Sequence, residues 1–321
     1  MGNDNLAMLD SQLVELLRSL KESGAPELQT LSPPDARGAY QKGVQLLSGE
    51  APDIKRTVDT SIEASDSPIA IRLYYPERES RSSLPLVVYF HGGGWSFGSI
   101  DTHDNVCRTL CAGATCIVAS VDYHLAPEHK FPMAIQDAIA ASLWAHENAA
   151  GLGADPQKIV LAGDSAGANL AAVAALAARD TGQPDILCQL LICPATDMSM
   201  AYPSHNTFGD GYRLTRPLMV WSSSNYLRDG RDIMDPRASP LYANDHSSLP
   251  PAIIITAGFD PLRDEGAAYA AKLREAGIEV QYRCFENLIH GFINLTGVVD
   301  SAAHALDEIV LMLKGHLVCR S

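Results

Sequence analysis

Residues 158–178 constrain the fold of this chain more than any other stretch. The apolar run 159–162 is typical of a short buried strand, and the alanine-rich run 166–178 is typical of a helix. Between them lies the pattern Gly163-x-Ser165-x-Gly167. So tight a turn from strand to helix holds its central residue in a strained conformation, and the flanking glycines leave the room that it needs. The stretch therefore predicts a sharp turn that presents the Ser165 hydroxyl beside the N-terminus of a helix.

Short apolar strands alternate with helices from residue 86 to the end of the chain. The expected strands are 86–90, 117–121, 158–162, 189–193, 252–256 and 278–285. The expected helices are 103–112, 134–150, 166–178, 264–276 and 301–313. Strands that are apolar on both faces and separated by helices are typical of a mainly parallel sheet covered on both sides. The predicted fold class is therefore α/β.

Two helices and a pair of strands are expected before this alternation begins. Leucines recur at helical spacing over residues 6–20, and Ser32 followed by Pro33 is typical of the start of a second helix. Residues 56–63 and 69–75 alternate in polarity as an antiparallel strand pair does.

The interval 197–249 interrupts the alternation of strands and helices. It is rich in Ser, Tyr, Pro and Asp, and only residues 217–227 indicate a helix. So long an insertion within an α/β domain is commonly a lid or a pocket wall. We therefore expect this interval to form part of a binding pocket.

Composition excludes several classes of partner. The 321 residues carry 38 acidic and 24 basic side chains, a net charge of −14, and no basic run that could follow a phosphate backbone, so no nucleic-acid partner is expected. No apolar run reaches membrane-spanning length, and the N-terminus lacks the apolar core of a signal peptide. Of the seven cysteines, Cys107, Cys111 and Cys116 come closest to a cluster, but no pair at zinc-ligand spacing completes it. We expect no metal, no membrane association, and buried thiols in a reducing cytoplasm.

A glycine-rich loop directly follows the strand 86–90. In His91-Gly92-Gly93-Gly94-Trp95, the three glycines allow backbone N–H groups to converge without interference from side chains. Such a loop could also hold a phosphate, but the chain has neither a Lys-Ser/Thr pair nor a G-x-G-x-x-G pattern here. The loop therefore favours stabilisation of an oxyanion.

Two further polar residues follow strand ends. Asp260 comes after the strand 252–256, and His290 comes after the strand 278–285. Because parallel strands end at the same edge of a sheet, both are expected near Ser165. The order Ser, Asp, His predicts a nucleophile, an orienting carboxylate and a base. Asp197 and Asp264 are the alternative candidates for the carboxylate.

These motifs resemble those of the hormone-sensitive-lipase-like carboxylesterases, a branch of the α/β-hydrolases, over essentially the whole chain. The segments that carry the resemblance are His91-Gly92-Gly93-Gly94-Trp95, Tyr123-His124-Leu125-Ala126-Pro127-Glu128, Gly163-Asp164-Ser165-Ala166-Gly167, Asp260-Pro261-Leu262-Arg263-Asp264-Glu265-Gly266 and His290-Gly291-Phe292. The chain departs from the family pattern at His124, where Arg is common, and at Ala168, where Gly is common. Ala168 is still small, whereas His124 is expected to alter an ion pair around Glu128.

The resemblance implies an α/β-hydrolase fold with a helical cap. Residues 51–196 and 250–321 would form the catalytic domain, while residues 1–50 and 197–249 would form the cap. It also implies hydrolysis of short- to medium-chain acyl esters without a cofactor, and a homodimer formed through residues 278–285 and the last helix.

The resemblance implies roles for single residues as well. The N–H groups of Gly92, Gly93 and Ala166 would form the oxyanion hole, with Gly94 as a further candidate. Asp164 would support the nucleophile, and Glu128 would be structural. Candidates for the pocket wall are Trp95, Phe208, Leu214, Trp221, Ile289 and Phe292.

Two other functions remain open at this level. An amide or N-formyl hydrolase could use the same residues, because the chemistry up to the acyl-enzyme is shared. A ligand-binding protein without activity could also be built on this fold.

Overall fold

The computed structural model describes residues 8–64, 66–77 and 83–318. Its centre is an eight-stranded sheet with the strand order β1-β2-β4-β3-β5-β6-β7-β8. The strands are β1 (Arg56–Ile62), β2 (Ile69–Tyr75), β3 (Leu84–Phe90), β4 (Ile117–Asp122), β5 (Ala154–Asp164), β6 (Cys188–Ile192), β7 (Ala252–Phe259) and β8 (Val280–Ile289). The pairs β1–β2 and β2–β4 are antiparallel, and all others are parallel. The mainly parallel sheet and its antiparallel pair are thus confirmed.

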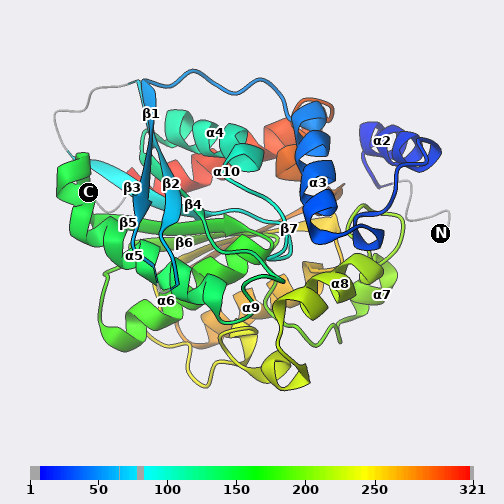
Figure 1. Ribbon diagram of the computed structural model, residues 1–321. Coiled ribbons are helices and arrows are strands. Elements are labelled where there is room, and N and C mark those ends of the chain that lie inside the picture. The colour runs from blue at the N-terminus through cyan, green and yellow to red at the C-terminus, as the bar shows by residue number, and fades with distance from the viewer. Residues whose placement is uncertain (1–7, 65, 78–82, 319–321) are drawn as a thin grey trace.

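Helices cover both faces of this sheet (Figure 1). One face is covered by α4 (Asp104–Ala114) and α10 (Asp300–Val318). The other is covered by α5 (Met133–Leu152), α6 (Ala166–Thr181) and α9 (Arg263–Glu275). The five helices that the sequence predicted between the strands from residue 86 onward are all present, and their ends differ from the predicted ones by a few residues.

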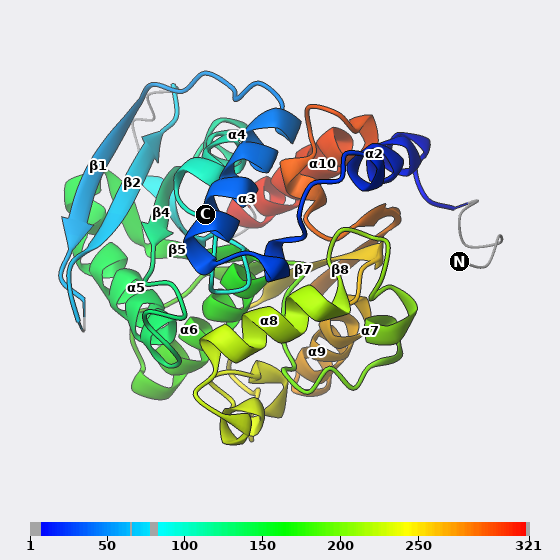
Figure 2. The same ribbon diagram turned by 45° about the vertical axis from the view of Figure 1, so that its right-hand side comes forward.

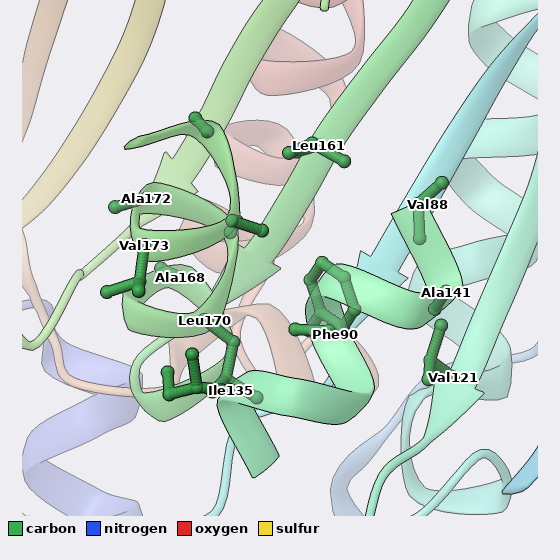
Figure 3. Close-up of a cluster of buried hydrophobic side chains, with 14 of the residues drawn as sticks. Val88, Phe90, Val121, Ile135, Ala141, Leu161, Ala168, Leu170, Ala172 and Val173 are labelled. Atoms are coloured by element: carbon green, nitrogen blue, oxygen red, sulfur yellow. The ribbon is translucent and has the colours of Figure 1, made fainter. Parts of the chain in front are cut away.

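Successive residues of the central strands enter two different cores. Val88 and Phe90 of β3 lie in one core with Ile135 and Ala141 of α5 and Leu170 of α6 (Figure 3). Val87 and Tyr89 of the same strand pack against the helices on the opposite face. Because both faces are buried, these strands are apolar at nearly every position.

The N-terminal segment and the interval 197–249 lie at the same end of the sheet (Figure 2). The N-terminal segment forms α2 (Ser11–Glu22), η1 (Leu28–Thr30) and α3 (Pro33–Leu47); residues 6 and 7 of the first predicted helix lie outside the described residues. The interval forms α7 (Pro203–Thr207), α8 (Arg216–Tyr226), η3 (Gly230–Met234) and η4 (Pro240–Tyr242), and none of its residues forms a strand. η1 contacts both α3 and α8, so the two segments meet.

Arg37 connects α3 to the loops that follow β3 and β4. Its guanidinium donates to the carbonyls of Ser96 and Ala126 and pairs with Glu128. The expectation that His124 alters this ion pair is wrong, because His124 Nδ1 bonds to Asp137 Oδ2 at 2.8 Å.

No helix within the described ranges is long and apolar enough to cross a lipid bilayer.

Candidate active site

Ser165 occupies a strained turn between β5 and α6. Its backbone angles are φ 54° and ψ −118°, a conformation that residues other than glycine rarely adopt. A Cβ added to Gly163 would lie 2.5 Å from the Gly167 carbonyl carbon, and one added to Gly167 would lie 1.9 Å from the Phe90 carbonyl oxygen. The Ser165 N–H donates to the Ile192 carbonyl at 2.8 Å, which fixes the turn against β6. Both glycines of the pattern are therefore required by close backbone contacts.

His290 joins Ser165 to Asp260. It directly follows β8, and its Nε2 lies 3.0 Å from Ser165 Oγ. Its Nδ1 lies 2.8 Å from Asp260 Oδ2. Asp260 is fully buried at the end of β7, and its other oxygen accepts the Leu262 N–H at 2.8 Å. This arrangement can remove a proton from the hydroxyl and stabilise the imidazolium that results.

The two alternative carboxylates have other partners. Asp197 accepts hydrogen bonds from the Tyr242 hydroxyl at 2.9 Å and from the Ser199 N–H. Asp264 accepts from Arg263 Nε at 2.9 Å. Of the three candidates, Asp260 is the one that bonds to His290.

The glycine loop offers fewer free donors than the resemblance implied. The Gly92 N–H donates to Asp164 Oδ1 at 2.9 Å, so this group is already engaged, and its assignment to the oxyanion hole is wrong. Gly93 and Gly94 have positive φ angles of 128° and 55° and border the cavity in front of Ser165. Their N–H groups donate to no residue that the structure describes. Ala166 begins α6, so its N–H has no acceptor within the helix.

Asp164, the last residue of β5, holds the glycine loop in place through the Gly92 N–H. Besides Gly92, it accepts a hydrogen bond from the Tyr89 hydroxyl at 2.8 Å, and its Oδ1 lies 3.2 Å from His103 Nε2. Burial alone would raise the pKa of Asp164, but His103 and these hydrogen bonds hold it below its usual value. The neighbouring His91 has its pKa lowered to about 3 by burial and by repulsion from His103. Asp164 is thus ionised at neutral pH and accepts a hydrogen bond from the glycine loop.

A cavity of about 250 Å³ opens in front of Ser165 and His290. Its wall comes from α3, the glycine loop, α8 and the loop before α8. Of the six predicted wall residues, Trp95 and Leu214 line it. Phe292 borders a smaller crevice behind His290.

Phe208, Trp221 and Ile289 do not line this cavity. Phe208 packs edge-on against Tyr212 and Phe259, and Ile289 is fully buried as the last residue of β8. Trp221 is partly buried, with its ring centre 6.4 Å from that of Phe97. The prediction of these three as wall residues is therefore wrong: Phe208 and Ile289 are buried in the core, and Trp221 is not among the residues that line the cavity.

Two groups of side chains in the described part of the chain could hold a metal ion. One, Cys193 with Asp260 and His290, overlaps the pair of hydrogen bonds described above. The other, Asp66 with His124 and His129, lies away from the cavity, near β1 and β2.

Sequence patterns did not indicate four residues that shape this site. Tyr89 and His103 contact Asp164 from β3 and from the start of α4. Tyr40 and Arg213 line the cavity from α3 and from the loop before α8. No motif contains Tyr40 or Arg213, so only the folded chain brings them together.

Comparisons with known proteins agree with this geometry. A family model described as the alpha/beta hydrolase fold matches residues 87–294. The carboxylic ester hydrolase LipN of Mycobacterium tuberculosis is 45% identical over 265 residues, which cover 81% of this chain and 70% of that protein. An ethyl acetate hydrolase of Pseudomonas putida is 34% identical over 311 residues, covering 95% of this chain and 96% of that protein.

Solved structures agree as well. A variant of an α/β hydrolase from the metagenome of Lake Arreo, Spain, has a TM-score of 0.93 at 40% identity and covers 97% of this chain and 99% of that chain. The chain therefore belongs to the α/β-hydrolase fold family, within its hormone-sensitive-lipase-like branch of carboxylesterases.

Proposed function

We propose that this chain hydrolyses carboxylic esters, with Ser165 as nucleophile, His290 as general base and acid, and Asp260 as the residue that orients the imidazole. The observation that carries the proposal is the pair of hydrogen bonds, 3.0 Å between Ser165 and His290 and 2.8 Å between His290 and Asp260. The relatives named as ester hydrolases support the same reaction.

Ser165 Oγ attacks the ester carbonyl while His290 Nε2 takes its proton. The carbonyl oxygen becomes an oxyanion that accepts hydrogen bonds from the N–H groups of Gly93, Gly94 and Ala166. Each such donor contributes about 3 kcal/mol in comparable sites. His290 then protonates the leaving alkoxide oxygen as the ester C–O bond breaks. In the second half it takes a proton from the water that attacks the acyl carbon, and it returns this proton to Ser165 Oγ as the carboxylic acid leaves. Asp260 stays ionised throughout and stabilises the imidazolium.

The size of the cavity supports short- to medium-chain acyl groups. Its volume of about 250 Å³ lies below the range of about 300–1,000 Å³ that holds drug-sized ligands. Residues from 1–50 and from 197–249 contribute to its wall, which supports their role as a cap over a catalytic domain of residues 51–196 and 250–321.

The test is Ser165→Ala, assayed with 4-nitrophenyl butyrate and with a fluorophosphonate probe. Loss of turnover by several orders of magnitude, loss of labelling and an unchanged Tm are expected, because the side chain is small and its backbone remains in place. Turnover that persists in the variant overturns the assignment. If the wild-type chain cleaves 4-nitroacetanilide faster than 4-nitrophenyl acetate, it is an amide hydrolase instead.

The proposal extends to assembly and compartment. β8 is an edge strand, and an exposed edge can pair with a second copy, which supports a homodimer through β8 and α10. A monomeric mass in sedimentation equilibrium would contradict this.

Cys107, Cys111 and Cys116 are free and buried, which supports a location in a reducing cytoplasm. Fractionation of the native host tests that placement.

A further inference from the structure

Arg213 is the one Lys or Arg among the described residues that line the cavity. It lies in the loop before α8, and its Nη1 donates to the carbonyl of Gly291 at 3.1 Å. Gly291 directly follows His290, so the guanidinium lies beside the reacting groups. A guanidinium has five N–H donors, and this bond uses one of them.

Arg213 has no carboxylate partner in the described part of the chain. Three other arginines of the interval 197–249 have carboxylate partners: Arg228 pairs with Asp232, Arg231 with Asp229, and Arg237 with Asp235. The exposed Arg216 bonds to the Asn206 side chain. Burial lowers the pKa of Arg213, although a guanidinium remains cationic at neutral pH. Arg213 is partly withdrawn from water, and a charge in that position without a carboxylate partner is costly, so a chain that retains one in its cavity has a use for it.

Tyr40 supplies a second donor beside this guanidinium. It lines the same cavity from α3, and the charge of Arg213 acts on its phenol. Burial raises the pKa of Tyr40 to about 12, so the hydroxyl keeps its proton at neutral pH. The Tyr40 oxygen accepts a hydrogen bond from Asn294 Nδ2 at 3.3 Å, which leaves its own proton available to a ligand.

The acidic residues in the cavity wall are already engaged by the protein. Glu265 accepts hydrogen bonds from the Thr196 N–H at 2.6 Å and from His205 at 2.7 Å. Asp197 accepts one from Tyr242, and Asp164 is held by the donors described above. The guanidinium is therefore the charged group of the wall that still has unused hydrogen-bonding capacity.

We propose that the cavity binds esters that carry an ionised carboxylate besides the ester group, and that Arg213 and the Tyr40 hydroxyl bind this carboxylate. The proposal rests on the ester hydrolysis proposed above. A planar guanidinium matches two carboxylate oxygens, and such paired hydrogen bonds give both strength and orientation. Because the Gly291 carbonyl fixes the guanidinium, the carboxylate would lie only a few bonds from the ester carbonyl that Ser165 attacks.

The test compares an anionic ester with a neutral partner of similar shape. Monoethyl adipate against ethyl hexanoate places the carboxylate on the acyl side, and 4-acetoxybenzoate against 4-tolyl acetate places it on the alcohol side. For each pair, the ratio of kcat/KM, anionic over neutral, is measured for the wild-type chain and for Arg213→Met. We expect the variant to lower this ratio at least tenfold, about 1.4 kcal/mol, for one pair or both.

The ratio of kcat/KM values also separates loss of carboxylate binding from a general disturbance of the active site. Arg213→Met removes the bond to the Gly291 carbonyl, and any resulting displacement of His290 affects both esters of a pair equally. Arg213→Lys keeps the positive charge but lacks the planar guanidinium that binds two carboxylate oxygens. Its ratio is therefore expected to lie between those of the wild-type chain and Arg213→Met. The matched control is Arg216→Met, which removes the same charge from an exposed arginine that does not line the cavity.

The outcomes distinguish the two proposals. An unchanged ratio for both pairs in Arg213→Met, or an equal fall in Arg216→Met, overturns the carboxylate site while ester hydrolysis stands. If the wild-type chain hydrolyses none of the four esters and takes up no fluorophosphonate, the proposed function itself fails.

Discussion

Gly167→Ala tests whether the turn at Ser165 depends on close contact between two backbones. The added Cβ would lie 1.9 Å from the Phe90 carbonyl oxygen, 2.5 Å from the Phe90 carbonyl carbon and 2.6 Å from the His91 carbonyl oxygen. An ordinary contact needs at least 3.4 Å, so α6 and the end of β3 must separate by about 1.5 Å. All three atoms belong to the backbone, which cannot turn aside as a side chain would.

The magnitude follows from this displacement. Overpacking costs about 1–3 kcal/mol when side chains can adjust, so the upper end is expected here. For a chain of 321 residues the entropy of unfolding is about 0.7 kcal/mol per degree, and 3 kcal/mol corresponds to a fall in Tm of about 4–5 °C. A shift of about 1 Å between reacting groups costs about a hundredfold in rate, so kcat/KM is expected to fall at least that much.

The assays are thermal unfolding and hydrolysis of 4-nitrophenyl butyrate. Gly151→Ala is the matched control, because its added Cβ, at the exposed end of α5, meets no atom within 4 Å. This control is expected to keep its activity and to gain up to about 1 kcal/mol of stability. If Gly167→Ala unfolds within 1 °C of the wild-type chain and keeps kcat/KM within about twofold, the steric reasoning is refuted.

Two further predictions concern buried ionisable groups. Because the pKa of Asp164 is lower in the folded chain than in the unfolded one, its ionised form contributes stability above about pH 4, and this contribution is lost as the pH falls further. Tm measured from pH 6 to pH 3 should therefore fall less steeply in Asp164→Asn than in the wild-type chain, and parallel curves would contradict this. Burial raises the pKa of Cys107 and of Cys111, the latter to about 12, so iodoacetamide at pH 8 should leave both unmodified in the folded chain and alkylate both in guanidinium, as mass spectrometry of peptides would reveal.

Local rules account for the elements that the sequence predicted correctly. Apolar runs bounded by turns identified the strands of the parallel sheet, and Ser32 caps α3 as its position before Pro33 indicated. Because parallel strands end at one edge, chain order alone predicted that Ser165, Asp260 and His290 would lie close together, and hydrogen bonds join them.

Contacts between distant residues account for the errors. Nothing near Gly92 shows that its N–H is engaged, because its acceptor, Asp164, is 72 positions away. Phe208 is as apolar as Leu214, and periodicity in an irregular segment does not reveal which of them faces the core. Motif spacing describes turns and strand ends, and it carries no information about the direction of a loop side chain.

Local patterns therefore predicted the strands of the parallel sheet, the turn at Ser165 and the strand ends that Asp260 and His290 follow, because residues close together in the sequence carry these signals. The sequence did not reveal that the Gly92 N–H is engaged by Asp164 or that Arg213 lines the cavity. Both depend on partners from separate elements, such as Arg213 beside Gly291, which come together only when the interval 197–249 packs near the end of β8.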